Sequence, residues 1–211
     1  MKKFNAGDRN IELINSIAIK VEDHNNEKLS QEIYSLIIAN NQNYSTEIII
    51  KAELYMAKSA LSSNNLTKIN AFIDKYSEPI NLSNAYTELV KYYKINKDTL
   101  LEVNTYKKML DLFSDKPSFL NSYSWRMTEL NTNLTDALVQ VNIALSHVID
   151  KDKNYAQILD TKAEVLWKLG LFENAIKVIE EAIDIDGDSE YYKDQKKKIE
   201  NAKQNSISDT I

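Results

Sequence analysis

Residues 159–183 read LDTKAEVLWKLGLFENAIKVIEEAI, and this stretch decides the fold. Its apolar residues recur at steps of three and four, which is the spacing of one face of an amphipathic helix. Gly170 interrupts the pattern once, and glycine commonly ends a helix because it adopts the left-handed conformation without a steric penalty. The stretch therefore predicts two antiparallel helices, the first lined by Leu159, Ala163 and Leu166 and the second by Ala175, Ile179 and Ala182.

The same design occurs immediately before it. Ala137 and Ala144 precede Ala175 and Ala182 by 38 residues. Small side chains that recur at a fixed offset allow paired helices to approach closely. We therefore predict two successive helix pairs and a polar capping helix, at residues 118–149, 155–185 and 189–203.

This pattern resembles the tetratricopeptide repeat, because the small residues, the turn glycine and the aromatic Phe172 stand at that family's spacing. The chain departs from the family at Lys162, where an apolar residue is usual, and at Gly187, where proline is usual. Its period is about four residues longer than the usual ~34, and the earlier pair has Ser124 as its small residue. The resemblance implies a right-handed α-solenoid whose first helices line a concave face.

The rest of the chain is also predicted to be helical. Apolar stripes indicate one helix over 46–61 and others around 11–21, 29–37, 66–76, 85–92 and 103–113. Pro79 lies in a stretch, 77–83, where the stripe lapses, so we predict a loop and an internal boundary there. Residues 1–80 are then degenerate repeats, and 81–211 hold the clearer ones. The predicted fold is all-α, with about five antiparallel helix pairs and a cap in one continuous superhelix.

Composition excludes several other classes of protein. Three glycines and two prolines are too few for the many turns of a β-sandwich or a doubly wound sheet. The net charge is −5, and Arg9 and Arg126 are the only arginines, so we expect no nucleic-acid partner. The absence of cysteine excludes disulfides and thiolate chemistry. No signal peptide and no membrane-spanning stretch is predicted, so we expect no membrane insertion.

Candidate chemical sites are weak. Asp150, Asp152 and Asn154 match the first ligands of a calcium loop, but the required glycine and glutamate are missing, so we interpret them as a polar turn. The acidic residues around Gly187 are expected to end one helix and cap the next. His24 and His147 stand in different helix pairs without partner carboxylates. We expect no enzyme activity, no metal, no cofactor and no small-molecule substrate.

The resemblance places one set of side chains on the concave face. Trp125 and Trp167 would face one groove, and tryptophan is a favoured binding hot spot. The alternative interpretation is that both are core residues between helices. Acidic residues in the groove favour a basic or neutral peptide. The candidate partner-binding residues are Ser118, Asn121, Trp125, Thr128, Gln157, Asp160, Glu164 and Trp167. The predicted function is a non-catalytic protein–protein interaction scaffold.

A second resemblance leaves a different function open. Gly7-Asp8-Arg9-Asn10, the run 120–125 and the run 159–161 are similar to the helical extension that follows the thioredoxin-like domain of some bacterial extracytoplasmic proteins. The chain would then be an accessory domain of a periplasmic oxidoreductase whose redox domain is absent here, and otherwise we expect a cytoplasmic protein. A Cys-x-x-Cys motif encoded upstream would support this alternative.

Overall fold

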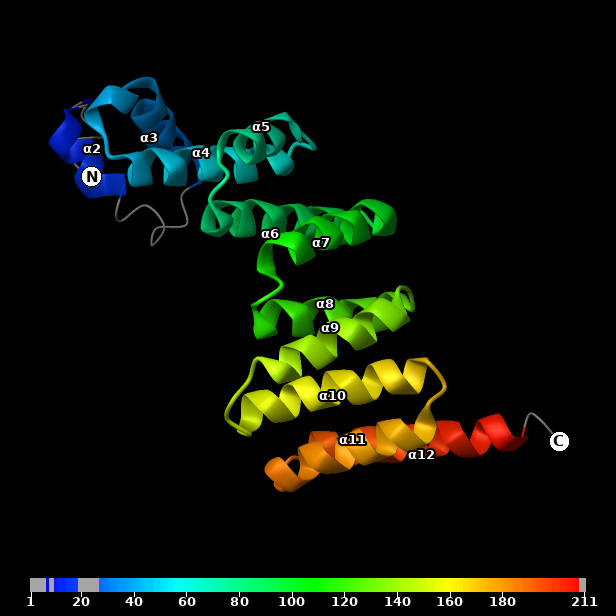
Figure 1. The fold of residues 1–211 in the computed structure, drawn as a ribbon. Helices are drawn as coiled ribbons and strands as arrows, with labels where there is room; N and C mark the ends of the chain where they lie inside the picture. The colour runs from blue at the N-terminus through cyan, green and yellow to red at the C-terminus, as the bar shows by residue number, and fades with distance from the viewer. Residues whose placement is uncertain (1–6, 8–9, 19–26, 209–211) are drawn as a thin grey trace. The chain divides into compact units, whose positions relative to one another are not determined.

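The computed structural model describes residue 7 and residues 10–18 and 27–208. Their regular structure is helical throughout, with no strand among them (Figure 1). This confirms the all-α prediction for the described part of the chain. Asp8, Arg9 and His24, which the sequence analysis singled out, lie outside the described residues.

The contacts group the chain into two compact units, residues 1–105 and 106–211, and the division falls inside one helix. The first unit holds a succession of helices, each of which packs against the next, while α4 also packs against α6. These helices are α2 (Ile11–Ala18), α3 (Glu27–Ala39), α4 (Thr46–Leu61), α5 (Thr67–Lys75) and α6 (Pro79–Ile95). The short 3₁₀-helix η2 (Asn41–Asn43) precedes α4, and the helix that spans the division is α7 (Thr99–Phe113).

The second unit contains two helical hairpins and a last helix. α8 packs against both α9 and α10, and α11 packs against both α10 and α12. Since each hairpin is closed by a short turn, its two helices are antiparallel, as Figure 1 shows. The helices are α8 (Pro117–Leu130), α9 (Leu134–Ser146), α10 (Lys153–Lys168), α11 (Phe172–Ile185) and α12 (Glu190–Ser208).

The repeated small residues lie where these helices pack. Ala137, Ala144, Ala175 and Ala182 are all fully buried. Ser124 is fully buried as well, and its hydroxyl lies 2.8 Å from the carbonyl oxygen of Leu120 and 2.9 Å from that of Ala137 on the partner helix. The serine hydroxyl is thus satisfied by the backbone, and serine serves as a small residue at this contact.

The turns of both hairpins depend on left-handed residues. Asn131 has φ 49° and Gly170 has φ 76°, a conformation that asparagine and glycine tolerate best. After Gly170, the amide of Leu171 donates to the carbonyl of Leu166 at 2.9 Å, which closes the end of α10. These two residues are why the turns could be located from the sequence.

Two predicted boundaries were wrong. The expected loop over 77–83 is much shorter, because α6 begins at Pro79, and Leu82 is buried. Proline suits the first turn of a helix, where its missing N–H would have no partner in any case. The last helix runs from Glu190 to Ser208 rather than ending at residue 203.

None of the described helices combines the length and the apolar character needed to cross a bilayer.

Candidate functional site

The candidate site is built on α10, which is buried over most of its circumference. Its first turn is fixed by Asp152, whose Oδ1 accepts hydrogen bonds from the amides of Asn154 at 2.9 Å and Tyr155 at 3.2 Å. The 150–154 segment is therefore a turn that caps a helix, as interpreted from the sequence. After α11, Ser189, and not an acidic residue, accepts from the amide of Tyr192 in the first turn of α12.

The face of α10 predicted to line the groove is covered by α12. Asp160 and Glu164 are only 7% and 8% exposed, and Trp167 is half-buried. The Tyr191 hydroxyl donates to Asp160 Oδ2 at 3.2 Å. Lys198 Nζ lies 3.6 Å from Glu164 Oε2 and 4.3 Å from the centre of the Trp167 ring. These three predicted partner-binding residues thus contact the chain's own last helix.

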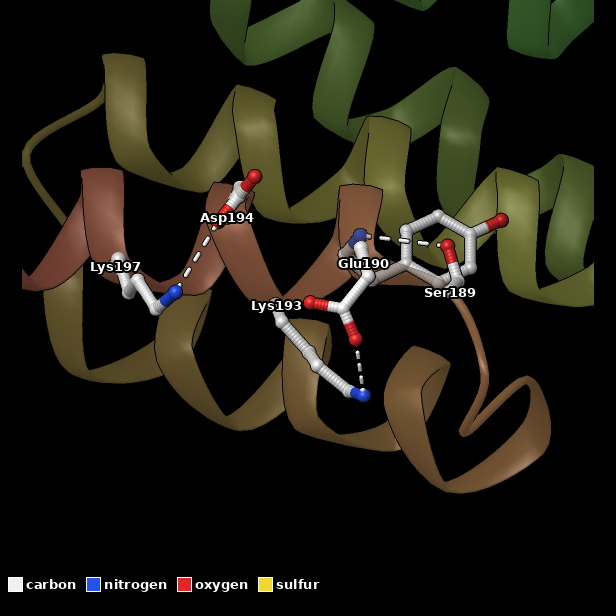
Figure 2. A network of polar contacts seen from close by, with 6 residues as sticks. Ser189, Glu190, Lys193, Asp194 and Lys197 are labelled. Atoms are coloured by element: carbon white, nitrogen blue, oxygen red, sulfur yellow. Dashed lines mark hydrogen bonds and ion pairs between the residues drawn. The ribbon is translucent and has the colours of Figure 1, made fainter.

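The buried anchors of α12 explain why it lies there. Tyr192 and Ile199 are seven residues apart, on one side of the helix, and are 6% and 1% exposed. They join the core formed by α10 and α11. Two other lysines of α12 form ion pairs within the helix: Lys193 pairs with Glu190 and Lys197 with Asp194, at 2.7 and 3.2 Å (Figure 2). Lys196 and Lys203 instead pair with Glu180 and Glu173 of α11. The lysine-rich surface of α12 is therefore a mixed-charge helix face.

This covered cluster is electrostatically unusual. The pKa of the Asp160 carboxyl is raised to about 6, mainly by burial and also by the neighbouring Glu164 carboxylate, while Tyr191 and Lys198 act in the opposite direction. Burial and the Asp160 charge also raise the pKa of the Tyr191 hydroxyl to about 12. Two carboxyl groups one helical turn apart share one nearby ammonium, so the charged form of Asp160 is poorly compensated.

The other predicted residues lie mainly on α8. Ser118 and Trp125 are seven residues apart, so they share the side of α8 opposite the buried stripe that contains Leu120, Tyr123 and Met127. Ser118 is exposed and Trp125 is half-buried. Gln157, at the start of α10, is exposed as well.

Asn121 and Thr128 differ from each other in what their side chains do. Thr128 is buried, and its hydroxyl donates to the carbonyl of Trp125 at 2.7 Å. Asn121 is half-buried, and its Oδ1 is enclosed without a hydrogen-bond donor among the described residues. An enclosed acceptor without a donor costs about 1–3 kcal/mol, so a rotation of this half-buried amide that lets Oδ1 meet an incoming N–H group would be favoured.

No protein-family model matches the chain, and no curated protein matches it. The tetratricopeptide resemblance therefore stays a prediction from the residues.

Two groups important to the site were not identified from the sequence. Tyr191 and Lys198 cover the predicted groove, and they come from a helix that was predicted only as a polar cap. The seven-residue spacing of Tyr192 and Ile199 was the available signal, since it shows which side of that helix is buried. Among the described residues, no three His, Asp or Glu side chains gather in a way that could hold a metal ion. His147 is exposed at the end of α9.

Proposed function

We propose that this chain is a non-catalytic scaffold that binds a peptide or protein segment on the open face of α8, next to the start of α10. The proposed contact residues are Ser118, Asn121 and Trp125, with Gln157 beside them. The Oδ1 of Asn121 carries this proposal, because it lacks a donor and a rotation of this half-buried side-chain amide would let a backbone N–H of a bound segment satisfy it. Trp125, one helical turn away, supplies a large rigid ring for the same contact.

The arrangement of the helices supports a repeat scaffold. α8 and α10 are the first helices of successive hairpins and pack against each other, and in the first unit α4 packs against α6. Contact between first helices is what a tetratricopeptide-like stack requires. We therefore propose that the hairpins form a right-handed α-solenoid.

From the sequence we expected a basic or neutral peptide, and the proposed ligand is the neutral one of these two. Asp160 and Glu164 would have favoured a basic peptide, but both contact α12. The four proposed contact residues, Ser118, Asn121, Trp125 and Gln157, are uncharged. A neutral segment that offers backbone N–H groups and an apolar side chain fits them better.

The experiment compares serine substitutions of the two tryptophans. Partners are first captured from the native organism with the full chain and identified by mass spectrometry. We expect Trp125→Ser to weaken capture of the identified partner at least tenfold, with a loss of unfolding free energy below about 1 kcal/mol. Trp167→Ser should mainly lower the free energy of unfolding and affect partner capture less, because the Trp167 ring packs beneath Lys198.

Asn121→Ala provides an independent check, since it removes the unsatisfied acceptor and leaves Trp125 in place. We expect it to weaken capture about tenfold and to leave stability unchanged or slightly increased. If Trp125→Ser instead lowers the melting temperature strongly and no separate binding defect is found, Trp125 is a core residue and the proposal fails.

A further inference from the structure

A second groove lies within the first unit, away from α8. It has a volume of about 410 Å³ and lies between α3 and α5, both of which pack against α4. Its floor is apolar and comes from Ile38, Met56 and Phe72, one from each helix. Phe72 is 3% exposed, whereas Ile38 and Met56 are half-exposed to the groove. Methionine adapts its shape easily, so this floor can accept apolar side chains of different shapes.

The α5 rim of this groove is positively charged. Lys68 and Lys75 are both exposed and line the groove. Being seven residues apart, they share one side of α5 and are separated by about 10 Å along its axis. Lys68 forms no ion pair with a described residue. Lys75 Nζ lies 2.7 and 2.8 Å from the two carboxylate oxygens of Glu53, and its side chain is 55% exposed.

These charges are a local exception in an acidic chain. The chain has a net charge of −5, yet the groove holds two ammonium groups and one carboxylate. Glu53 already interacts with Lys75 and with the Tyr76 hydroxyl, at 2.8 Å, so the unmatched charge lies at Lys68. A partner that brings carboxylates to this rim gains attraction, and a basic partner is repelled.

We infer that this groove docks the apolar face of an acidic amphipathic helix from a partner protein. The groove runs between α3 and α5 over α4, and all three helices contribute apolar residues to its floor. A helix fits such a groove with residues at steps of three and four pointing down. Carboxylates seven residues apart on a helix that runs along α5 would meet Lys68 and Lys75. The site uses other helices than the α8 face, so it is independent of the proposed function.

The probe is a designed, fluorescein-labelled helical peptide of about four turns, or ~14 residues. It carries a leucine stripe at steps of three and four, flanked by two glutamates seven residues apart. A companion peptide has lysine at those two positions. Binding to the full chain is followed by fluorescence anisotropy. We expect the glutamate peptide to bind at least tenfold more tightly, with an advantage that shrinks as salt is raised.

Two matched variants locate the binding. Ala71→Glu places a carboxylate in the groove, whereas Asn70→Glu adds the same charge on the far side of α5, since residue 70 is two positions from Lys68. Both residues are exposed, and circular dichroism checks that both variants fold. Ala71→Glu should lower the affinity for the glutamate peptide at least tenfold, and Asn70→Glu should change this affinity by less than about twofold.

A second pair of variants covers the case in which Ala71→Glu does not fold. Lys68→Glu should lower the affinity for the glutamate peptide, while Lys177→Glu, the same change on α11, should leave this affinity unchanged. Equal binding of the two peptides, or unchanged binding to Lys68→Glu, would overturn the inference. So would a wild-type dimer that Ala71→Glu dissociates in a sedimentation experiment, because the occupant would then be a second copy of the chain.

Discussion

Asp160 is a buried carboxyl whose ionisation works against folding. Its pKa is about 6 in the folded chain, compared with the ordinary value of 3.8. The folded state therefore binds this proton more tightly than the unfolded state does. The resulting stability is fully present below the ordinary pKa and is lost as the pH rises through about 6. Above that pH, the loss amounts to about 3 kcal/mol.

We therefore expect Asp160→Asn to stabilise the chain at about pH 7.5 by roughly 1–3 kcal/mol and to have little effect at about pH 4. The asparagine keeps an oxygen for the Tyr191 hydroxyl and removes the charge near Glu164, although Lys198 then loses part of its attraction. Urea unfolding at the two pH values measures the difference. Asp111→Asn, at an exposed position, is the control. The same effect of Asp160→Asn at both pH values would contradict the assignment.

The site residues were predictable only in part, and the reason is physical. The three-and-four spacing placed Asp160, Glu164 and Trp167 on one face of a helix, and the structure has them so. It could not show that Tyr191 and Lys198, 31 and 34 residues later, cover that face. Acidic residues one turn apart are usually exposed, and only the contact with α12 makes them buried.

At the scale of elements, the helices that were located best have strong end signals. Residues 46–61 were predicted to be one helix, and α4 has these bounds because Ser45 accepts from the amide of Ile48 and Asn64 adopts φ 56° beyond its end. The start of α6 was missed because Pro79 is as suitable for a loop as for a first helical turn. The burial of Leu82, which decides between the two, depends on packing.

The packing of α11 gives a test at the same scale. Ala182 is fully buried in the core shared by α10, α11 and α12. Ala182→Leu would insert a larger side chain into this close contact, and we expect it to cost about 1–3 kcal/mol or more. Its neighbour Glu181 is exposed, so Glu181→Leu should change stability by less than about 0.5 kcal/mol. Denaturant unfolding followed by circular dichroism compares them, and equal effects would show that the contact is not close.

For the whole molecule, the helical class was the most predictable property. The few glycines and prolines and the unbroken three-and-four spacing exclude most sheet folds on their own. The division of contacts after residue 105 has no signal in the sequence, because it falls within the continuous helix α7. Neighbour-to-neighbour packing within each unit suggests that stability is local, as in repeat proteins.

A matched pair of core deletions tests that locality. Ile69 and Ile179 are both fully buried, one in each unit, and replacing either with alanine should cost about 2–5 kcal/mol. We expect Ile69→Ala to speed amide hydrogen exchange in α4, α5 and α6, and Ile179→Ala to speed it in α10, α11 and α12. Mass spectrometry of exchanged peptides measures both. Faster exchange throughout the chain in either variant would mean that it unfolds as one cooperative body.

The ammonium of Lys198 over the ring of Trp167 has a practical consequence. The chain has only two tryptophans. Trp167 contacts the last helix through Lys198, and Lys168 of α10 lies 4.6 Å from the centre of the same ring. A cation held over an indole ring changes the local electric field, and this field influences the wavelength at which the indole fluoresces. In variants that keep only one tryptophan, intrinsic fluorescence therefore reports separately on changes at α8, through Trp125, and on the docking of α12, through Trp167. No attached dye is needed.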